Sequence, residues 1–501
     1  MPRATGFDDR LASVRPSARQ LAWQARELYG FLHVGMNTMT DAEWGTGRED
    51  PALFDPPDVD ADEWVRCLAG AGMTGVVLTA KHHDGFCLWP TATTTHSVAA
   101  SPWREGRGDL VREVADAAQR HGLALGIYLS PWDRSHPAYG SGRAYDDVYV
   151  AQLTELLSGY GPVFSVWLDG ANGEGPTGAR QVYDWERYHA VVRELQPDAV
   201  LSVCGPDVRW CGNEAGHTRP DEWSVVPRAL QDAERTASQS QRSDDPGFAR
   251  LVRSDDEDLG SRAALAGQDE LVWYPAEVNT SIRPGWFHHP AEDGEVRSAD
   301  ELFALYRSVV GGNATLLLNV PPDRRGRIGA PDKEALAGLG RRVAALRASA
   351  LDAAVEASSG EVLDPTLPAA SRWLGGVAGT APWWRPAADD PEPTLTLDLG
   401  AVEPVDAVVV KEAIREGQRV EGLVVSGRRD GVWRELARTG SVGYQRILGI
   451  GAEVDALRLA VTAARGVPVL AGAAALAAGA VPPGAVPPGA VPPPGGGSAQ
   501  R

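Results

Sequence analysis

Apolar runs of strand length alternate with amphipathic helix patterns between about Leu28 and Leu346. The apolar runs predict strands over 29–37, 75–80, 123–129, 163–168, 199–203, 271–274 and 315–320. The patterns between them predict helices over 61–71, 110–118, 146–157, 185–195 and 302–310. This βαβα order indicates a parallel sheet, and the number of repeats favours a TIM-like (β/α) barrel over an open, doubly wound sheet. The open sheet stays the alternative, but the Gly-rich nucleotide-binding fingerprint that would support it does not follow the first strand.

Two other parts of the chain lack the alternating strand and helix patterns. Residues 228–269 are polar, charged and poorly periodic, which predicts a long excursion on the face of the barrel. After Ala350, short alternating apolar segments with Gly and Asp turns are typical of an antiparallel β-sandwich. The AVPPG repeats that follow predict an extended tail without a packed core. We therefore expect a catalytic barrel domain over 1–350, a β-sandwich over 351–475 and a disordered Pro/Gly-rich tail over 476–501.

Charge and hydropathy narrow the classes of partner. The 501 residues include 48 Lys and Arg against 67 Asp and Glu, which gives a formal net charge of -19. Nucleic acid is not expected as a partner, because such binding depends on Lys and Arg contacts with phosphates. We expect no membrane partner either, since every apolar run is too short to span a bilayer. The N-terminal segment lacks the continuous apolar stretch of a secretory signal, so we expect a cytoplasmic location.

Cysteine and tryptophan usage adds two expectations. The four cysteines are too few and too scattered for a disulfide framework or a Cys-rich zinc site. We expect reduced thiols, although the spacing also allows a bridge between Cys204 and Cys211. Sixteen tryptophans are many for this length. Some belong to the core, but flat apolar rings with one donor also stack on the C–H faces of sugars.

Candidate carboxylates stand at the ends of predicted strands. Asp169 ends the run VFSVWL, and the C-terminal edge of the strands is where parallel barrels carry their chemistry, although Asp followed by Gly is also an ordinary turn signal. Cleavage of a glycosidic bond needs a proton donor and a second carboxylate. Glu214 is the better donor, because small residues and aromatics around it favour desolvation, which raises a carboxyl pKa, whereas Arg283 near Glu277 would lower one. Glu277 stays in reserve; an ion pair to Arg283 and a surface acid in a loop are its structural alternatives.

The segment KHHDGF places His82, His83 and Asp84 after a predicted strand. A metal site is disfavoured, because adjacent histidines point in different directions and a third ligand at a recognised spacing is missing. The histidines could instead hydrogen-bond a polyhydroxylated ligand, or Asp84 could hold one of them as an internal contact. His33 ends the first strand in the same way. These polar groups converge only if the sheet closes into a barrel.

Several segments in a fixed order carry a resemblance to a known family. They are FLHVGMNTMTDAEWGTG, LTAKHHDGF, VFSVWLDG, RWCGNEAG, SIRPGWFHH and GGNATLLLNVPPDRRG. They resemble the retaining α-L-fucosidases of glycoside hydrolase family 29, and within it the branch that removes α-1,3- or α-1,4-linked fucose from branched glycans. The resemblance runs from about Tyr29 to Leu346. It continues through VVVKEAIREGQRVEGLVV and GYQRILGI, which are similar to the sandwich domain that follows the barrel in these enzymes.

The resemblance implies a role for each candidate residue. Asp169 would be the nucleophile and Glu214 the acid/base of a double displacement through a covalent fucosyl-enzyme. The acid/base position shifts between branches of the family; the motif NEAG supports Glu214, and Glu277 remains the reserve. The residues that would contact the sugar are His33, Glu43, Trp44, His82, His83, Tyr128, Trp132 and Trp286. We expect a fucosylated oligosaccharide as substrate, and neither a cofactor nor a metal, because two carboxylates suffice.

Two other functions stay open on the sequence. One is a barrel glycosidase acting on a related sugar such as galactose. The other is a non-catalytic fucose-binding protein, against which the presence of both carboxylates counts. The sandwich is expected to brace the barrel; binding of glycan through Trp383, Trp384 or Trp433 is the alternative.

Overall fold

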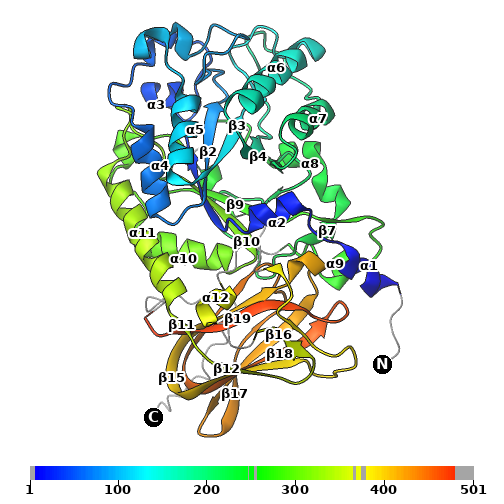
Figure 1. The fold of residues 1–501 in the computed structure, drawn as a ribbon. Helices are drawn as coiled ribbons and strands as arrows, with labels where there is room; N and C mark the ends of the chain where they lie inside the picture. Colours follow the sequence, from blue (N-terminus) through cyan, green and yellow to red (C-terminus); the bar gives the residue numbers. More distant parts are fainter. Residues whose placement is uncertain (1–5, 246, 253–256, 365–367, 374–379, 480–501) are drawn as a thin grey trace, which may run out of the picture.

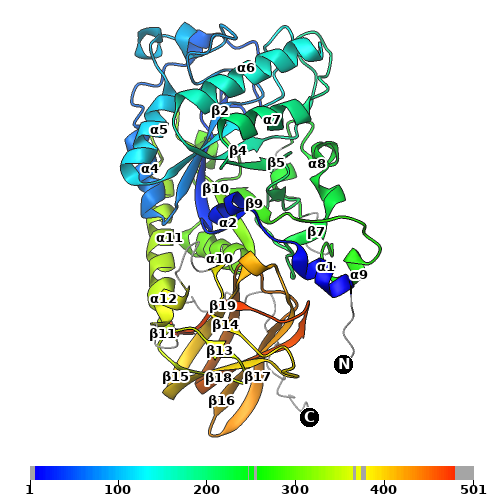
Figure 2. The ribbon, with the colours of Figure 1, turned by 45° about the vertical axis from the view of Figure 1, so that its right-hand side comes forward.

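The computed structural model describes residues 6–245, 247–252, 257–364, 368–373 and 380–479. A barrel of strands and helices forms one end of the molecule, and an antiparallel β-structure forms the other (Figure 1). The same two bodies remain stacked end to end when the molecule is turned by 45° (Figure 2). The AVPPG repeats, for which we expect an extended tail, lie outside the described residues.

The barrel is built from parallel strands in the order β5-β4-β3-β2-β1-β10-β9-β6. Their bounds are Leu28–Leu32 (β1), Gly75–Lys81 (β2), Ala124–Leu129 (β3), Val163–Leu168 (β4), Val200–Val203 (β5), Arg209–Trp210 (β6), Ala276–Ser281 (β9) and Ala314–Asn319 (β10). An isolated parallel bridge between Ser202 and Val208 joins the two edges, β5 and β6. The sheet is therefore nearly closed, and the predicted TIM-like fold is confirmed.

Helices cover the outside of the barrel. The longer ones are α4 (Ala61–Gly70), α5 (Leu110–His121), α6 (Arg143–Gly159), α7 (Trp185–Leu195), α10 (Ala299–Val310) and α11 (Ala330–Ala348). The shorter helices of the chain are α1 (Phe7–Ser13), α2 (Ala18–Gln24), α3 (Met36–Thr40), α8 (Ala233–Gln239), α9 (Arg262–Leu265) and α12 (Ala369–Trp373), of which α12 packs against the C-terminal sheet. Side-chain caps start several of them: the Asp109 carboxylate accepts from the Arg112 N–H at 2.9 Å, as the N-cap position favours.

Two strand predictions are wrong in part. The predicted strand over 29–37 ends at Leu32, and α3 begins at Met36. The predicted strand over 271–274 exists as β8 (Leu271–Trp273), but it pairs antiparallel with β7 (Val225–Pro227) outside the barrel. The barrel strand at this point is β9, which the apolar pattern misses because its buried side chains include Glu277 and Asn279.

The C-terminal body is an antiparallel sheet, which confirms that class of fold. Its strands are β11 (Ala350–Leu351), β12 (Ala354–Ala357), β13 (Glu361–Val362), β14 (Trp384–Arg385), β15 (Thr394–Glu412), β16 (Val420–Arg429), β17 (Val432–Thr439), β18 (Arg446–Ala464) and β19 (Leu470–Ala477). Trp383 and Trp384 are buried in its core. The Arg458 guanidinium lies 4.1 Å from the centre of the Trp433 ring. Trp383 and Trp384 therefore serve packing in this body, whereas Trp433 is partly exposed.

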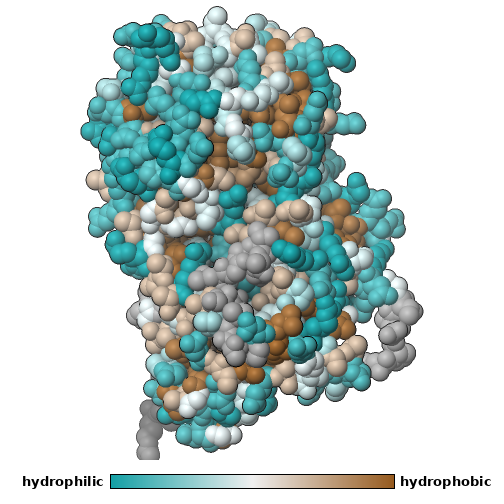
Figure 3. Space-filling model, in the orientation of Figure 1, coloured by the Kyte–Doolittle hydropathy of each residue, from teal (hydrophilic) through white to brown (hydrophobic). Residues whose placement is uncertain are grey.

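The outer surface agrees with the acidic composition. On the face seen in Figure 3, hydrophilic residues cover most of the barrel helices, and apolar residues show in smaller patches. Among the described residues, no helix is both long and apolar enough to cross a membrane. All four cysteines are free thiols, so the Cys204–Cys211 bridge does not form; Cys67 is only partly buried and the others are buried.

Candidate active site

A cavity opens at the C-terminal end of the barrel strands. The predicted site residues that line it are His33, Trp44, His82, His83, Tyr128, Asp169, Glu214 and Trp286. Their positions span most of the barrel domain, and closure of the sheet brings them to one edge. Both candidate carboxylates thus face the same space, whereas Glu43 and Trp132 have other surroundings.

Asp169 follows β4 and is held in one orientation. Its Oδ1 accepts from the Ala171 N–H at 2.8 Å, and its Oδ2 accepts from the Tyr128 hydroxyl at 2.8 Å. The Nε2 of His83 lies 3.9 Å from the same Oδ2, and the Asp169 side chain is 20% exposed. Burial, together with the neighbouring Asp169 charge, raises the pKa of Tyr128 well above its ordinary value, so that hydroxyl remains a donor. The carboxylate is fixed yet open to the cavity.

Glu214 lies in the loop after β6. The indole N–H of Trp286 donates to its Oε2 at 3.1 Å. Trp286 also lines the cavity, and its ring lies 5.1 Å from that of His33. The same two residues, Glu214 and Trp286, line a second cavity beside the first. Glu214 therefore stands at the boundary between two adjoining spaces.

His33 presents a hydrogen-bond acceptor to the cavity. Its Nδ1 lies 2.8 Å from Asn319 Oδ1. The Asn319 amide nitrogen already donates to Ser281 Oγ and to the Trp286 carbonyl, so its Oδ1 is the accepting atom. His33 Nδ1 therefore carries the proton, and Nε2 keeps a lone pair. Burial lowers the pKa of His33 to about 3, which keeps the ring neutral near pH 7.

The two neighbouring histidines have opposite tautomers. The Asn37 amide donates to His82 Nδ1 at 3.1 Å and to the Glu43 carbonyl, so the proton of His82 is on Nε2. His83 Nδ1 donates to Ser130 Oγ at 2.7 Å, because that hydroxyl itself donates to the Trp132 carbonyl. Burial lowers the pKa of His82 well below 6.5 and that of His83 to about 4. The cavity thus meets one imidazole donor and two imidazole acceptors.

The expectation that adjacent histidines diverge is wrong. Strand β2 ends at Lys81, so His82 and His83 lie beyond it rather than in extended backbone, and their ring centres are only 4.1 Å apart. Asp84 does not hold either ring; its Oδ1 accepts from the Phe86 N–H at 2.8 Å. Asn37 and Ser130 orient the two rings instead.

Glu43 supports the wall of the cavity from behind. Its carboxylate accepts from the backbone N–H groups of Trp286 and Phe287, both at 3.0 Å. It also accepts from His289 Nε2 at 2.8 Å, and this hydrogen bond is the main reason that the pKa of His289 rises to about 9. Glu43 therefore fixes the segment that carries Trp286 and has its acceptors occupied by protein groups.

Trp132 also lies behind the lining. Its ring centre is 5.1 Å from that of Trp44 and 5.0 Å from that of His83, and its N–H donates to the Glu174 carbonyl at 3.2 Å. Trp44 itself lines the cavity. Trp132 thus sets the positions of two lining rings.

Glu277 is placed differently from the sequence expectation. It is the second residue of β9 rather than its last, and it is fully buried in the barrel. The Tyr29 hydroxyl donates to its Oε2, and the Trp167 N–H donates to its Oε1 at 2.7 Å. Burial raises the pKa of Glu277 to about 7. The expected ion pair with Arg283 is wrong, because that guanidinium binds Asp332.

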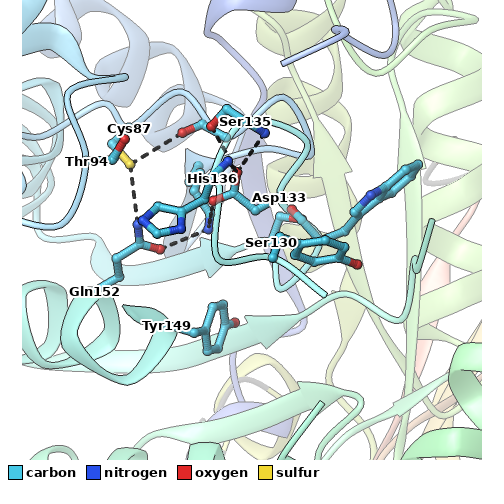
Figure 4. A network of polar contacts seen from close by, with 12 residues as sticks. Cys87, Thr94, Ser130, Asp133, Ser135, His136, Tyr149 and Gln152 are labelled. Atoms are coloured by element: carbon cyan, nitrogen blue, oxygen red, sulfur yellow. Dashed lines mark hydrogen bonds and ion pairs between the residues drawn. The ribbon is translucent and has the colours of Figure 1, made fainter. Parts of the chain in front are cut away.

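A buried polar network holds the loops that carry the histidines. Lys81 Nζ donates to Asp133 Oδ2 at 3.0 Å and to Gln152 Oε1 at 2.9 Å. Asp133 Oδ1 in turn accepts from the Ser135 and His136 N–H groups. Figure 4 shows part of this network around Asp133 and Gln152. The Lys81 and Asp133 side chains are both fully buried, so the pair ties the end of β2 to the loop after β3.

Several lining residues were missed by sequence reasoning. They are Phe31, Trp167, Ala171, Val203, Trp210, Ser240, Gln241, Phe248 and Asn279. Phe31 had a signal, because it stands two residues before His33 and alternate side chains of a strand share a face. Ser240, Gln241 and Phe248 come from the polar segment 228–269, whose sequence pattern gave no signal that these residues line a cavity. Among the described residues, no cluster of three or more His, Cys, Asp or Glu is arranged to hold a metal.

Taken together, the fold and the cavity define a glycoside hydrolase. Comparisons with known proteins agree. The profile of the Alpha-L-fucosidase family matches residues 48–345. Alpha-L-fucosidase 1 of Arabidopsis thaliana is 36% identical over 461 residues, which are 91% of this chain and 86% of the plant protein.

Solved structures show the same relationship. A candidate α-L-fucosidase from Bacteroides ovatus superposes with a TM-score of 0.81 at 40% identity, covering 96% of this chain and 77% of that one. A family 29 fucosidase of Ruminococcus gnavus in complex with fucose superposes with a TM-score of 0.76 at 27% identity, covering 93% of this chain and 96% of that one. The chain belongs to the α-L-fucosidase family.

Proposed function

We propose that this α-L-fucosidase is a retaining exo-enzyme that releases terminal α-1,3- or α-1,4-linked fucose from branched glycans. Asp169 attacks the anomeric carbon and forms a covalent fucosyl-enzyme while Glu214 protonates the leaving sugar oxygen. Glu214 then takes a proton from the water that releases fucose. The observation that carries the proposal is that Asp169 and Glu214 line one cavity.

The lining of the cavity suits a 6-deoxy sugar. The imidazole acceptors of His33 and His83 and the donor of His82 pair with ring hydroxyls, which are both donors and acceptors. Phe31 and Trp167 supply an apolar wall, which suits a methyl group better than a hydroxymethyl group. Fucose bound to the Ruminococcus gnavus relative supports the choice of sugar.

The second cavity supports a branched leaving group. It adjoins the first at Glu214 and Trp286, on the side where the acid must meet the glycosidic oxygen. Thr280, Arg250 and Glu295 line it with polar groups that can bind sugar hydroxyls. A space of this kind holds the remainder of a branched glycan after the fucose has entered the first cavity.

Two substitutions and two substrates test the mechanism. Asp169→Ala should abolish hydrolysis of an aryl fucoside, and added azide should yield the β-fucosyl azide that a vacated nucleophile position permits. Glu214→Ala should lose far more activity on a branched Lewis-type oligosaccharide than on nitrophenyl fucoside, because a good leaving group needs no proton. Wild-type turnover in Asp169→Ala would refute the assignment of Asp169 as nucleophile. Equal losses of activity on the two substrates in Glu214→Ala would refute the assignment of Glu214 as acid. Hydrolysis of nitrophenyl galactoside at the same rate as nitrophenyl fucoside would refute the proposed preference for fucose.

A further inference from the structure

The loop that carries Glu214 is held by the C-terminal sheet. This loop, residues 211–224, leaves the barrel after β6 and runs toward β7. Residues 213–217 of this loop form a turn that is closed by hydrogen bonds within the loop. The Asn213 side-chain amide donates to the His217 carbonyl at 3.0 Å and accepts from the His217 N–H at 3.2 Å. Glu214 lies inside this five-residue turn. Any displacement of the turn therefore moves the carboxyl group.

A buried ionic cluster links that turn to residues 219–222 of the loop. Arg219 donates to the Cys211 carbonyl at 3.2 Å and to Glu222 Oε2 at 3.4 Å. Glu222 also pairs with Arg209 of β6, and its side chain is fully buried. Coulombic attraction from both arginines holds the pKa of Glu222 below its ordinary value, although burial opposes this. Glu222 is thus a charged anchor for the loop.

The C-terminal sheet binds the loop around this anchor. Gln418 donates to the Glu222 carbonyl and accepts from the Ser224 N–H at 2.8 Å. Arg446, the first residue of β18, donates to the Pro220 carbonyl. The Gly440 N–H donates to Asp221 Oδ1 at 2.9 Å. A Cβ added at Gly440 would meet the Asp221 carboxylate at 2.3 Å, so the Gly440 backbone lies in close contact with the Asp221 side chain.

These contacts are buried, and they act together with groups of the barrel: the Asn313 amide, which precedes β10, also donates to the Glu222 carbonyl at 2.8 Å. Gln418 is fully buried and Arg446 is 5% exposed. The groups that hold Asp169, namely Tyr128, Ala171 and His83, all belong to the barrel. The barrel therefore positions Asp169, whereas the loop that carries Glu214 is held by both the barrel and the C-terminal sheet. A small shift of the sheet against the barrel changes the distance between the two carboxylates.

We propose that Arg446 and Gln418 are positioning residues for proton transfer: through residues 220–224 they set the place of Glu214 opposite Asp169. This rests on the proposed role of Glu214 as acid/base. It assigns the C-terminal sheet a share in catalysis beyond bracing the barrel. This contribution of the C-terminal sheet is limited to reaction steps that need a proton from Glu214. The residues that contact fucose and the nucleophile Asp169 do not depend on the sheet.

Arg446→Met and Gln418→Met test the proposal in the full-length enzyme. Each keeps the volume of the side chain and removes its hydrogen bonds to the loop. We expect kcat/KM for the branched oligosaccharide to fall about tenfold and that for nitrophenyl fucoside to change less than about twofold, because a misplaced acid costs rate only where a proton is needed. Arg446→Lys, which keeps a donor, should recover part of the loss. Leu459→Ala is the matched control, since it opens a cavity in the core of the sheet without touching the loop.

A double-mutant cycle separates this proposal from the one it rests on. If Arg446 acts through Glu214, Arg446→Met has no further effect in the Glu214→Ala background. Equal losses on the two substrates in Arg446→Met and Gln418→Met, or the same selective loss in Leu459→Ala, would overturn the positioning role. An additive effect in the cycle would overturn it as well. Failure of the acid/base assignment is seen independently, as equal losses on both substrates in Glu214→Ala alone.

Discussion

Glu277→Gln is expected to remove a pH-dependent weakness from the core of the barrel. The carboxyl group is fully buried between Tyr29 and Trp167, and its pKa is raised by burial from 4.5 to about 7. Between these pH values the folded protein keeps the Glu277 proton, whereas the unfolded chain releases it. The protonated form therefore stabilises the fold below pH 4.5, and this stabilisation is lost as the pH rises through about 7.

The size of the effect follows from the two pKa values. At about 1.4 kcal/mol for each pH unit between them, the loss amounts to about 3 kcal/mol of unfolding free energy. The glutamine side chain of the variant has no charge to bury. Its carbonyl can still accept from the Trp167 N–H, which donates to Oε1 of Glu277 in the wild type. The variant should therefore lose the hydrogen bond that the Tyr29 hydroxyl donates in the wild type, and this loss should be the same at every pH.

Urea unfolding at pH 4.5, 6 and 8 measures this difference. The quantity compared is the unfolding free energy of the wild type minus that of Glu277→Gln, because the titration of His33 and His83 occurs in both proteins and cancels. We expect this difference to fall by about 3 kcal/mol from the lowest pH to the highest. A flat difference, or one that rises with pH, would refute the argument that burial outweighs the hydrogen bonds from Tyr29 and Trp167.

The same variant decides whether Glu277 acts in catalysis. Because its oxygens face Tyr29 and Trp167, we expect Glu277→Gln to keep its kcat/KM ratio between the branched oligosaccharide and nitrophenyl fucoside. A selective loss on the oligosaccharide would return Glu277 to the role of acid/base.

Three further substitutions test the supports of the site. Tyr128→Phe removes a donor from Asp169, so kcat/KM on nitrophenyl fucoside should fall about tenfold or more while the melting temperature changes little; an unchanged rate would contradict this. Glu43→Gln frees the Trp286 segment, and we expect about a tenfold loss of kcat/KM; the exposed variant Glu186→Gln serves as control. Arg283→Met leaves the buried Asp332 charge without its partner and should lower the unfolding free energy by about 3 to 5 kcal/mol, whereas a loss below about 1 kcal/mol would show that the pair is dispensable.

Local signals were sufficient for much of the site. Asp169 directly follows the predicted strand 163–168, and His82 lies two residues beyond the predicted strand 75–80; parallel strands in a closed sheet bring such residues to one edge. Phe31 could have been added by the alternation of a strand. Glu214 was chosen from its small and aromatic neighbours and supported by the motif NEAG, whereas β6 before it has only two residues and gives no apolar run. Strand β9 was missed for a related reason, since its buried polar side chains break the apolar pattern on which the prediction depends.

Other features depend on partners far away along the chain. The tautomer of His33 is set by Asn319, and the contacts of Trp286 are set by Glu43 and Glu214. Ser240 and Gln241 reach the cavity from a segment without periodicity. Glu277 illustrates the limit best: the nearby Arg283 suggested a lowered pKa, yet the guanidinium binds Asp332 and burial raises the pKa of Glu277 instead.

The order of strands and helices along this chain determined the barrel, and the acids at strand ends determined where its chemistry lies, because both follow from periods of a few residues. The tertiary structure alone decided which acid faces the cavity, which imidazole nitrogens carry protons and which groups hold the loop of Glu214. These properties depend on burial and on hydrogen bonds between residues hundreds of positions apart. Such contacts exist only once the sheet has closed and the C-terminal body has packed against it.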